Sequence, residues 1–188
     1  MKINKLLKKA RKNQHVVSFF RGSGWSDFSL GYVDELCDGF VRIKSLNKFG
    51  ERVGYEIVEL NDIEKIQING LYESKTKQLN ERFEKSNKYA ENNLEFSKGE
   101  NLLDVVLDKS TKEELVISLW LTNENDSITG IVQNEDDGII SLLAINEYGD
   151  VSGNIFIYYD DVAVVDINGK RELSINYLYM RKKSVMSK

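Results

Sequence analysis

An internal repeat constrains the fold of this chain more than any other feature. Residues 45–70, SLNKFGERVGYEIVELNDIEKIQING, align without a gap to residues 144–169, AINEYGDVSGNIFIYYDDVAVVDING, at an offset of 99. Extended back to Gly31 and Gly130, the alignment covers 40 positions, of which 11 are identical. The identical residues are mostly Gly, Asn and Asp, which tight turns require. The repeat therefore predicts two copies of one small, turn-rich module.

Each copy carries the signals of five short strands. Asp38-Gly39 and Asp137-Gly138 separate apolar-rich segments, which is a strong hairpin signal. Val41 and Ile43 alternate with charged residues, as in a half-buried strand. The predicted strands are 15–21, 28–36, 40–46 and 53–60 in the first copy, then 114–122, 127–134, 139–145 and 152–159 in the second, and a short fifth strand ends each copy before Asn69-Gly70 or Asn168-Gly169.

A short helix is predicted before the first strand of each copy. At the same offset of 99, three apolar residues with helical spacing in one copy fall on three in the other. These residues are Ile3, Leu6 and Leu7, which fall on Leu102, Val105 and Val106. We therefore expect helices over 2–12 and 101–109.

The order of one helix and five short strands resembles the Sm-like fold, in which a helix precedes a strongly bent, five-stranded SH3-like barrel. The resemblance rests on that order, on the segments Gly31-Tyr32-Val33 and Gly130-Ile131-Val132, and on Asp62-Ile63 and Asp161-Val162 before the fifth strand. It implies a mainly β fold with two tandem barrels. Five short strands commonly curl in this way, because closure removes exposed edges.

The predicted domain organisation has three parts. Residues 1–72 form the first helix-plus-barrel module, 73–100 a charged helical linker, and 101–188 the second module with a C-terminal tail. Residues 71–100 contain six Lys or Arg and six Glu, and their apolar spacing predicts a helix over 74–91. The apolar tail at 173–180 is expected to form a second docking helix.

Composition argues against several classes of function. The single cysteine, Cys37, excludes an intrachain disulfide and favours the cytoplasm. No apolar run approaches the roughly 18 residues of a membrane span, and the basic start lacks the apolar segment of a signal peptide. The lone His15 and Cys37 form no catalytic or zinc-type pattern. We expect no enzyme activity, no cofactor and no membrane partner.

Two segments suggest ligand chemistry more weakly. Carboxylates at Glu135-Asp136-Asp137 and Asp160-Asp161 are of the type that binds Ca²⁺ or Mg²⁺, but a solvated hairpin tip explains them better. Residues 21–25 are glycine-rich but lack the lysine and the spacing of a phosphate-binding loop. We therefore expect no metal site.

The two copies differ most where charge in the first becomes apolar in the second. Six positions change in this direction and two, at Glu135 and Asp136, change in reverse. Exposed apolar patches usually mark contact surfaces, so the second copy predicts a protein interface or a homo-oligomer. Its residues are Leu143, Val151, Ile155, Tyr158 and Val164. Packing against the linker helix or the first barrel is an equally weighted explanation.

Charge segregation supplies an alternative function. Residues 1–21 carry seven Lys or Arg and no acid, whereas residues 101–170 carry 14 Asp or Glu and three Lys or Arg. A basic patch of this kind predicts RNA or DNA binding by the first module. Its residues are Lys8, Lys9, Arg11, Lys12, Arg21, Arg42 and Lys44. The acidic second module would repel the same polyanion, so we expect a protein partner or self-contact through complementary charge in preference.

Overall fold

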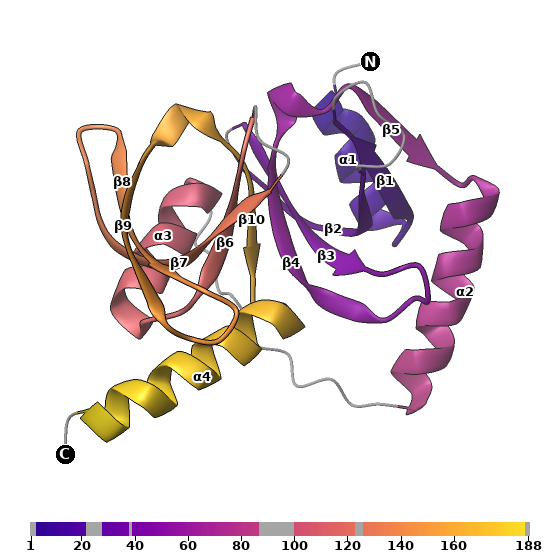
Figure 1. The fold of residues 1–188 in the computed structure, drawn as a ribbon. Coiled ribbons are helices and arrows are strands. Elements are labelled where there is room, and N and C mark those ends of the chain that lie inside the picture. The colour runs from indigo at the N-terminus through magenta and orange to yellow at the C-terminus, as the bar shows by residue number, and fades with distance from the viewer. Residues whose placement is uncertain (1–2, 22–27, 38, 87–99, 123–125, 187–188) are drawn as a thin grey trace. The chain divides into compact units, whose positions relative to one another are not determined.

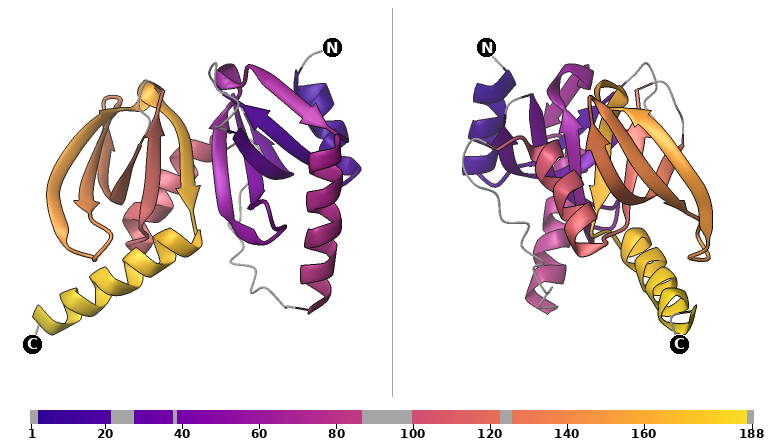
Figure 2. Two further views of the ribbon diagram at one scale, coloured as in Figure 1. Left: turned by 45° about the vertical axis from the view of Figure 1, so that its right-hand side comes forward. Right: turned by 90° about the vertical axis from the view of Figure 1, so that its left-hand side faces the viewer.

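The chain is mainly β, with ten antiparallel strands and four α-helices in the residues described by its computed structural model (Figure 1). These residues are 3–21, 28–37, 39–86, 100–122 and 126–186. They divide into two compact units, Met1–Leu102 and Leu103–Lys188. Within each unit the strands are strongly curved, as two further views show (Figure 2).

The first unit runs helix, five strands, helix. Its elements are α1 (Ile3–Lys12), β1 (Val16–Phe20), β2 (Phe28–Cys37), β3 (Phe40–Leu46), β4 (Arg52–Glu59), a 3-10 turn (Leu60–Asp62), β5 (Lys65–Ile68) and α2 (Leu71–Ser86). The strands pair in the order β5-β1-β2-β3-β4.

The second unit repeats this order. Its elements are α3 (Leu102–Glu113), β6 (Ile117–Leu121), β7 (Ser127–Asp136), β8 (Ile139–Ile145), β9 (Val151–Tyr158), a 3-10 turn (Tyr159–Asp161), β10 (Val162–Ile167) and α4 (Lys170–Met186). The strands pair in the order β10-β6-β7-β8-β9. In neither unit are the first and last strands of this order hydrogen-bonded to one another within the described segments, so closure into a barrel stays a prediction.

The predicted turns are confirmed where the structure describes them. Asp137 and Gly138 have φ of 49° and 74°, the two positive values that a two-residue hairpin turn needs. At the next turn, Asn146 Oδ1 accepts hydrogen bonds from the backbone N–H groups of Tyr148 and Asp150, at 3.0 and 2.9 Å. Asn47 does the same for Phe49 and Glu51. Asp38 lies outside the described residues.

The structure corrects the register of the repeat near the start of each unit. Val17 pairs with Gly31, and Ile117 pairs with Gly130, so β1 and β6 are related by 100 positions and not by 99. Both helices end in the same way at this new offset: Gln14 and Glu114 have φ of 50° and 51°. Leu7 is therefore equivalent to Leu107, not to Val106. Between the equivalent cross-strand pairs Phe20–Phe28 and Trp120–Ser127, the first copy has seven residues and the second has six, a difference of one.

The helices α2 and α4 occupy equivalent places, one after the fifth strand of each unit. Gly50 lies against the backbone of α2 at Leu79 and Asn80, and Gly149 lies against α4 at Leu178 and Tyr179. A Cβ atom at Gly149 would lie 2.7 Å from the Cβ of Leu178, so only glycine permits this approach. The charged segment predicted as a linker thus begins with a helix that contacts its own unit, at β1.

A buried carboxylate positions each of these helices. Glu73, the third residue of α2, accepts a hydrogen bond from the hydroxyl of Ser18, and Glu172, the third residue of α4, accepts one of 2.6 Å from Ser118. Both glutamates are less than 5% exposed. A buried polar group needs such a partner, because leaving it unpaired is costly. The pairs therefore fix where each helix starts on the sheet.

Candidate functional site

The strands β8 and β9 of the second unit display an exposed apolar face. Cross-strand partners share a face of a sheet, and β9 pairs with β8 as Tyr158 with Ile139 and Phe156 with Ser141. Phe156 is 70% exposed, Tyr158 68% and Ile139 39%. We call these three residues, together with Leu143 and Val151, the outer face of the second unit.

The helix α4 covers one end of this side of the sheet. Ile131 of β7 and Ile145 of β8 are buried in a cluster with Val116 and with Ile175 of α4, and Tyr179 packs against it. The other end of β8 and β9, with Phe156 and Tyr158, lies beyond this cluster and is exposed. The outer face is therefore the uncovered remainder of a partly covered sheet.

Of the five residues predicted as an interface, three lie on the outer face and two do not. Val151 is 53% exposed and Tyr158 is on the outer face, and Leu143 is half-buried beside them. Val164 is only 1% exposed, so the structure excludes it from the surface. Ile155 is half-buried and pairs with Leu142, which is fully buried, so Ile155 points to the inner side.

Phe156 is the main residue of this face that the sequence comparison missed. Its counterpart 99 positions earlier, Ile57, is also apolar, so a search for charged-to-apolar changes does not detect it. The signal that would have found it is the alternation in β9, where Asn154, Phe156 and Tyr158 share one side of the strand.

Acidic side chains border the outer face at one end. Asp136 and Asp137 at the β7–β8 hairpin, and Asp160 and Asp161 after β9, are all exposed. The two segments are adjacent, because the backbone N–H of Tyr159 donates to the carbonyl of Gly138 at 2.8 Å. Within the described ranges no group of three His, Cys, Asp or Glu residues is arranged to hold a metal ion.

A groove of about 430 Å³ lies between α3 and β7. Asp104, Asp108 and Glu135 contribute carboxylates to its lining. Two of these are engaged: Asp108 pairs with Lys112 at 2.8 Å, and Asp104 accepts a hydrogen bond from the hydroxyl of Tyr159 at 2.6 Å. The groove therefore has a polar, acidic lining in which two of the three carboxylates contact other side chains.

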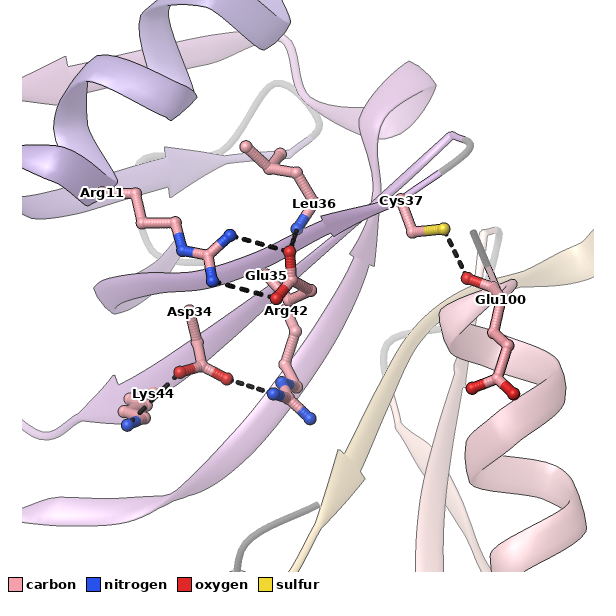
Figure 3. A network of polar contacts seen from close by, with 8 residues as sticks. All are labelled: Arg11, Asp34, Glu35, Leu36, Cys37, Arg42, Lys44 and Glu100. Carbon is pink, nitrogen blue, oxygen red and sulfur yellow. Dashed lines mark hydrogen bonds and ion pairs between the residues drawn. The ribbon is translucent and has the colours of Figure 1, made fainter. Parts of the chain in front are cut away.

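Three of the seven basic residues predicted for nucleic-acid binding pair with carboxylates within the first unit (Figure 3). Asp34 forms ion pairs with Arg42 and with Lys44, and Glu35 holds Arg11 through two hydrogen bonds of 2.7 and 2.9 Å. Burial lowers the pKa of Arg42, and the nearby Asp34 carboxylate opposes that shift. The guanidinium of Arg42 also lies 5.3 Å from the ring centre of Tyr55.

Of the basic residues predicted for nucleic-acid binding, three lysines of α1 are exposed. Lys8, Lys9 and Lys12 form no ion pair with any residue the structure describes. Arg21 is half-buried and donates a hydrogen bond of 3.3 Å to Ser29. The basic surface is therefore one helix, not a patch that extends over β3.

The single cysteine and the single histidine stand apart from any catalytic arrangement in the described ranges. Cys37, at the end of β2, and His15, which follows α1, are each half-buried. The backbone N–H of His15 donates to the carbonyl of Ala10, which ends α1. This backbone bond gives position 15 a structural role.

No family model, curated protein sequence or solved structure is significantly similar to the chain. In the part of the chain that the structure describes, no helix is long and apolar enough to cross a membrane.

Proposed function

We propose that the chain is a non-enzymatic, cytoplasmic interaction protein made of two duplicated Sm-like barrels, and that it binds a protein partner through the outer face of the second unit. The observation that carries this proposal is the exposure of Phe156 and Tyr158, side by side on β9. Large aromatic side chains in water on one patch are typical of interaction sites.

The repeated order of elements supports the duplicated-barrel part of the proposal. The same turns, at the same offset of 99, join the third, fourth and fifth strands in both units. The 3-10 turns at Leu60–Asp62 and Tyr159–Asp161 also agree in position and in backbone angles. An inner apolar core and a helix before the five strands fit the Sm-like arrangement, and each unit adds a second helix after its fifth strand.

The test compares the wild-type chain with the double variant Phe156→Lys and Tyr158→Lys in affinity capture from the native cell extract. The control is Tyr177→Lys, which changes a residue of α4 that is 66% exposed. We expect wild type and control to retain the same partner and the double variant to lose it. Equal retention by all three proteins would reject the outer face as the contact surface.

Nucleic-acid binding by α1 is the second candidate, and the exposed Lys8, Lys9 and Lys12 favour it. If these lysines neutralise three phosphates of duplex DNA, raising salt from about 50 to about 200 mM should weaken binding about 40-fold. Titration of labelled RNA and DNA at both salt concentrations measures this effect. Absence of binding at low salt, or binding unchanged by Lys8→Glu with Lys12→Glu, ends this candidate.

A further inference from the structure

The strand β9 forms the edge of the second unit. Among the described strands of this unit, β8 is its single neighbour, through a ladder from Ile139 and Tyr158 to Ile145 and Val151. Its other edge therefore presents N–H and C=O groups outside that ladder. Exposed edges of this kind pair readily with another strand.

No charge protects this edge. The strand reads Val-Ser-Gly-Asn-Ile-Phe-Ile-Tyr and contains no charged residue, whereas β4 in the first unit contains Arg52, Glu56 and Glu59. The register shifts once, near Gly153, so that the stretch from Asn154 to Tyr158 is regular. An uncharged stretch of alternating aromatic and branched residues has high strand-pairing tendency.

We propose that a second copy of this chain pairs with β9 in antiparallel orientation, centred on Phe156, to form a two-fold symmetric dimer. This inference rests on the proposed function, because it names a partner for β9, the strand that carries the main residues of the outer face. In this register Phe156 faces Phe156 of the partner subunit, and Asn154 faces the partner's Tyr158. Cross-strand aromatic neighbours of this kind stabilise a sheet, and two-fold contacts of one patch with itself are the commonest in oligomers.

The distribution of charge around β9 selects the antiparallel orientation. Asp136, Asp137, Asp160 and Asp161 surround its C-terminal end. At its N-terminal end the β8–β9 turn carries two carboxylates, Glu147 and Asp150, and Asp150 pairs with Lys182 of α4. Parallel pairing would place the two acidic ends together, and like charges repel. Antiparallel pairing separates the two groups of four aspartates and places each beside the partner's N-terminal end, where Lys182 is present.

The absence of charge in β9 also favours a second copy over a charged partner. An isologous contact brings each side chain against the same strand, so any net charge in that strand would oppose itself. Val151–Tyr158 carries none. An acidic or basic peptide would find no complementary charge along the strand itself.

Sedimentation equilibrium of the full chain tests the proposal. We expect wild type to dimerise and Phe156→Lys to weaken dimerisation about 1,000-fold, since a central hot-spot residue contributes roughly 30-fold and the dimer contains two copies. Phe156 is 70% exposed, so this change should leave the fold intact, which circular dichroism checks. The control Tyr177→Lys should dimerise like wild type.

Cross-linking tests the orientation and the register. In a Cys37→Ser background, Phe156→Cys should form a disulfide-linked dimer under mild oxidation, because opposed residues at a two-fold axis have Cα atoms about 4.5–5.5 Å apart. Tyr177→Cys in the same background is the control and should stay uncross-linked. Equal cross-linking of both variants would overturn the register.

The outcomes separate the two proposals. A wild-type chain that stays monomeric, or a dimer that survives Phe156→Lys, overturns self-pairing through β9. The interaction function then still stands if the outer-face double variant loses a captured partner, and it falls if that variant retains every partner of wild type.

Discussion

The hydroxyl of Ser118 in β6 donates a 2.6 Å hydrogen bond to the carboxylate of Glu172 in α4, and both residues are buried. The oxygen of Ser118 also lies 3.1 Å from the hydroxyl oxygen of Thr129 in β7. The consecutive strands β6 and β7 and the more distant helix α4 therefore meet at one polar contact. The equivalent pair in the first unit, Ser18 with Glu73, joins β1 to α2.

Glu172→Ala should loosen α4 from the second unit. A hydrogen bond to a charged group contributes about 1.5–3 kcal/mol, and we expect a loss of that size in the free energy of unfolding. Chemical denaturation measures the loss, and hydrogen exchange should show that amides of α4 exchange faster. Glu147→Ala, in an exposed turn, is the control and should change neither. A coupling near zero between Ser118→Ala and Glu172→Ala would contradict this role.

Asp34→Ala should be far more destabilising than the neighbouring Glu35→Ala. The side chains of Arg42 and Asp34 are only 9% and 17% exposed, so removing the carboxylate leaves buried positive charge, at a cost of about 3 kcal/mol. Arg11 and Glu35 are 43% and 34% exposed, and pairs of that kind contribute less than about 1 kcal/mol. Urea denaturation of the two variants gives the comparison. Equal losses would show that the Asp34 cluster does not stabilise the unit.

Asp62→Asn should stabilise the first unit at neutral pH and have less effect in acid. Burial raises the pKa of Asp62, and the nearby Arg21 partly offsets this shift. A raised carboxyl pKa in the folded state means that folding favours the protonated form. The stability that protonated Asp62 contributes is fully present below the unfolded-state pKa, and it is lost as the pH rises through the folded-state pKa.

The gain from Asp62→Asn should therefore be larger at pH 7 than at pH 3. It should stay below about 1 kcal/mol, because the group is partly exposed. Thermal unfolding across this range measures it. The matched control is Asp161→Asn at the exposed equivalent position, which should change the stability at pH 7 less than Asp62→Asn does. If the stability gained by Asp62→Asn were larger in acid, burial could not be the cause of the raised pKa.

Asn146→Ala should destabilise the β8–β9 turn. Its side-chain oxygen accepts two backbone hydrogen bonds, so the loss should be about 2 kcal/mol, at roughly 1 kcal/mol for each bond. Asn146→Asp keeps the acceptor oxygen and should retain most of the stability. Equal unfolding midpoints for wild type and Asn146→Ala would show that the backbone alone holds this turn.

Local signals in the sequence predicted the strands and turns well. Turn residues such as Asn47, Gly50 and Asp137 act on their own backbone, so their effect is visible in a short window. The predicted strands 40–46 and 139–145 agree with β3 and β8 at both ends. The mainly β class followed from these signals.

The register of the first helix could not be found in this way. Apolar residues come in adjacent pairs there, Leu6 with Leu7 and Leu102 with Leu103, so a shift of one position preserves the helical pattern. The structure fixes the register through long-range pairing of β1 and β6. A loop that differs by one residue leaves no other trace in the sequence.

The equivalence of α2 and α4 was missed for a related reason. Glu73 and Glu172 stand at an offset of 99, but their partners Ser18 and Ser118 are 55 and 54 residues away in the chain. Charge and composition made one segment look like a linker and the other like a tail. The contact surface was half found, because a search for charged-to-apolar changes misses Phe156, whose counterpart Ile57 is apolar, and includes the buried Val164.

The contact between Gly149 and α4 has a consequence for aggregation. Any side chain at position 149 would act as a wedge between the turn and the helix, because even a Cβ atom would collide with Leu178. Separation of α4 from the sheet would expose Ile131 and Ile145, which lie next to the exposed residues of the outer face. The absence of a side chain at Gly149 thus limits the apolar surface that this unit exposes, and larger residues there should promote aggregation.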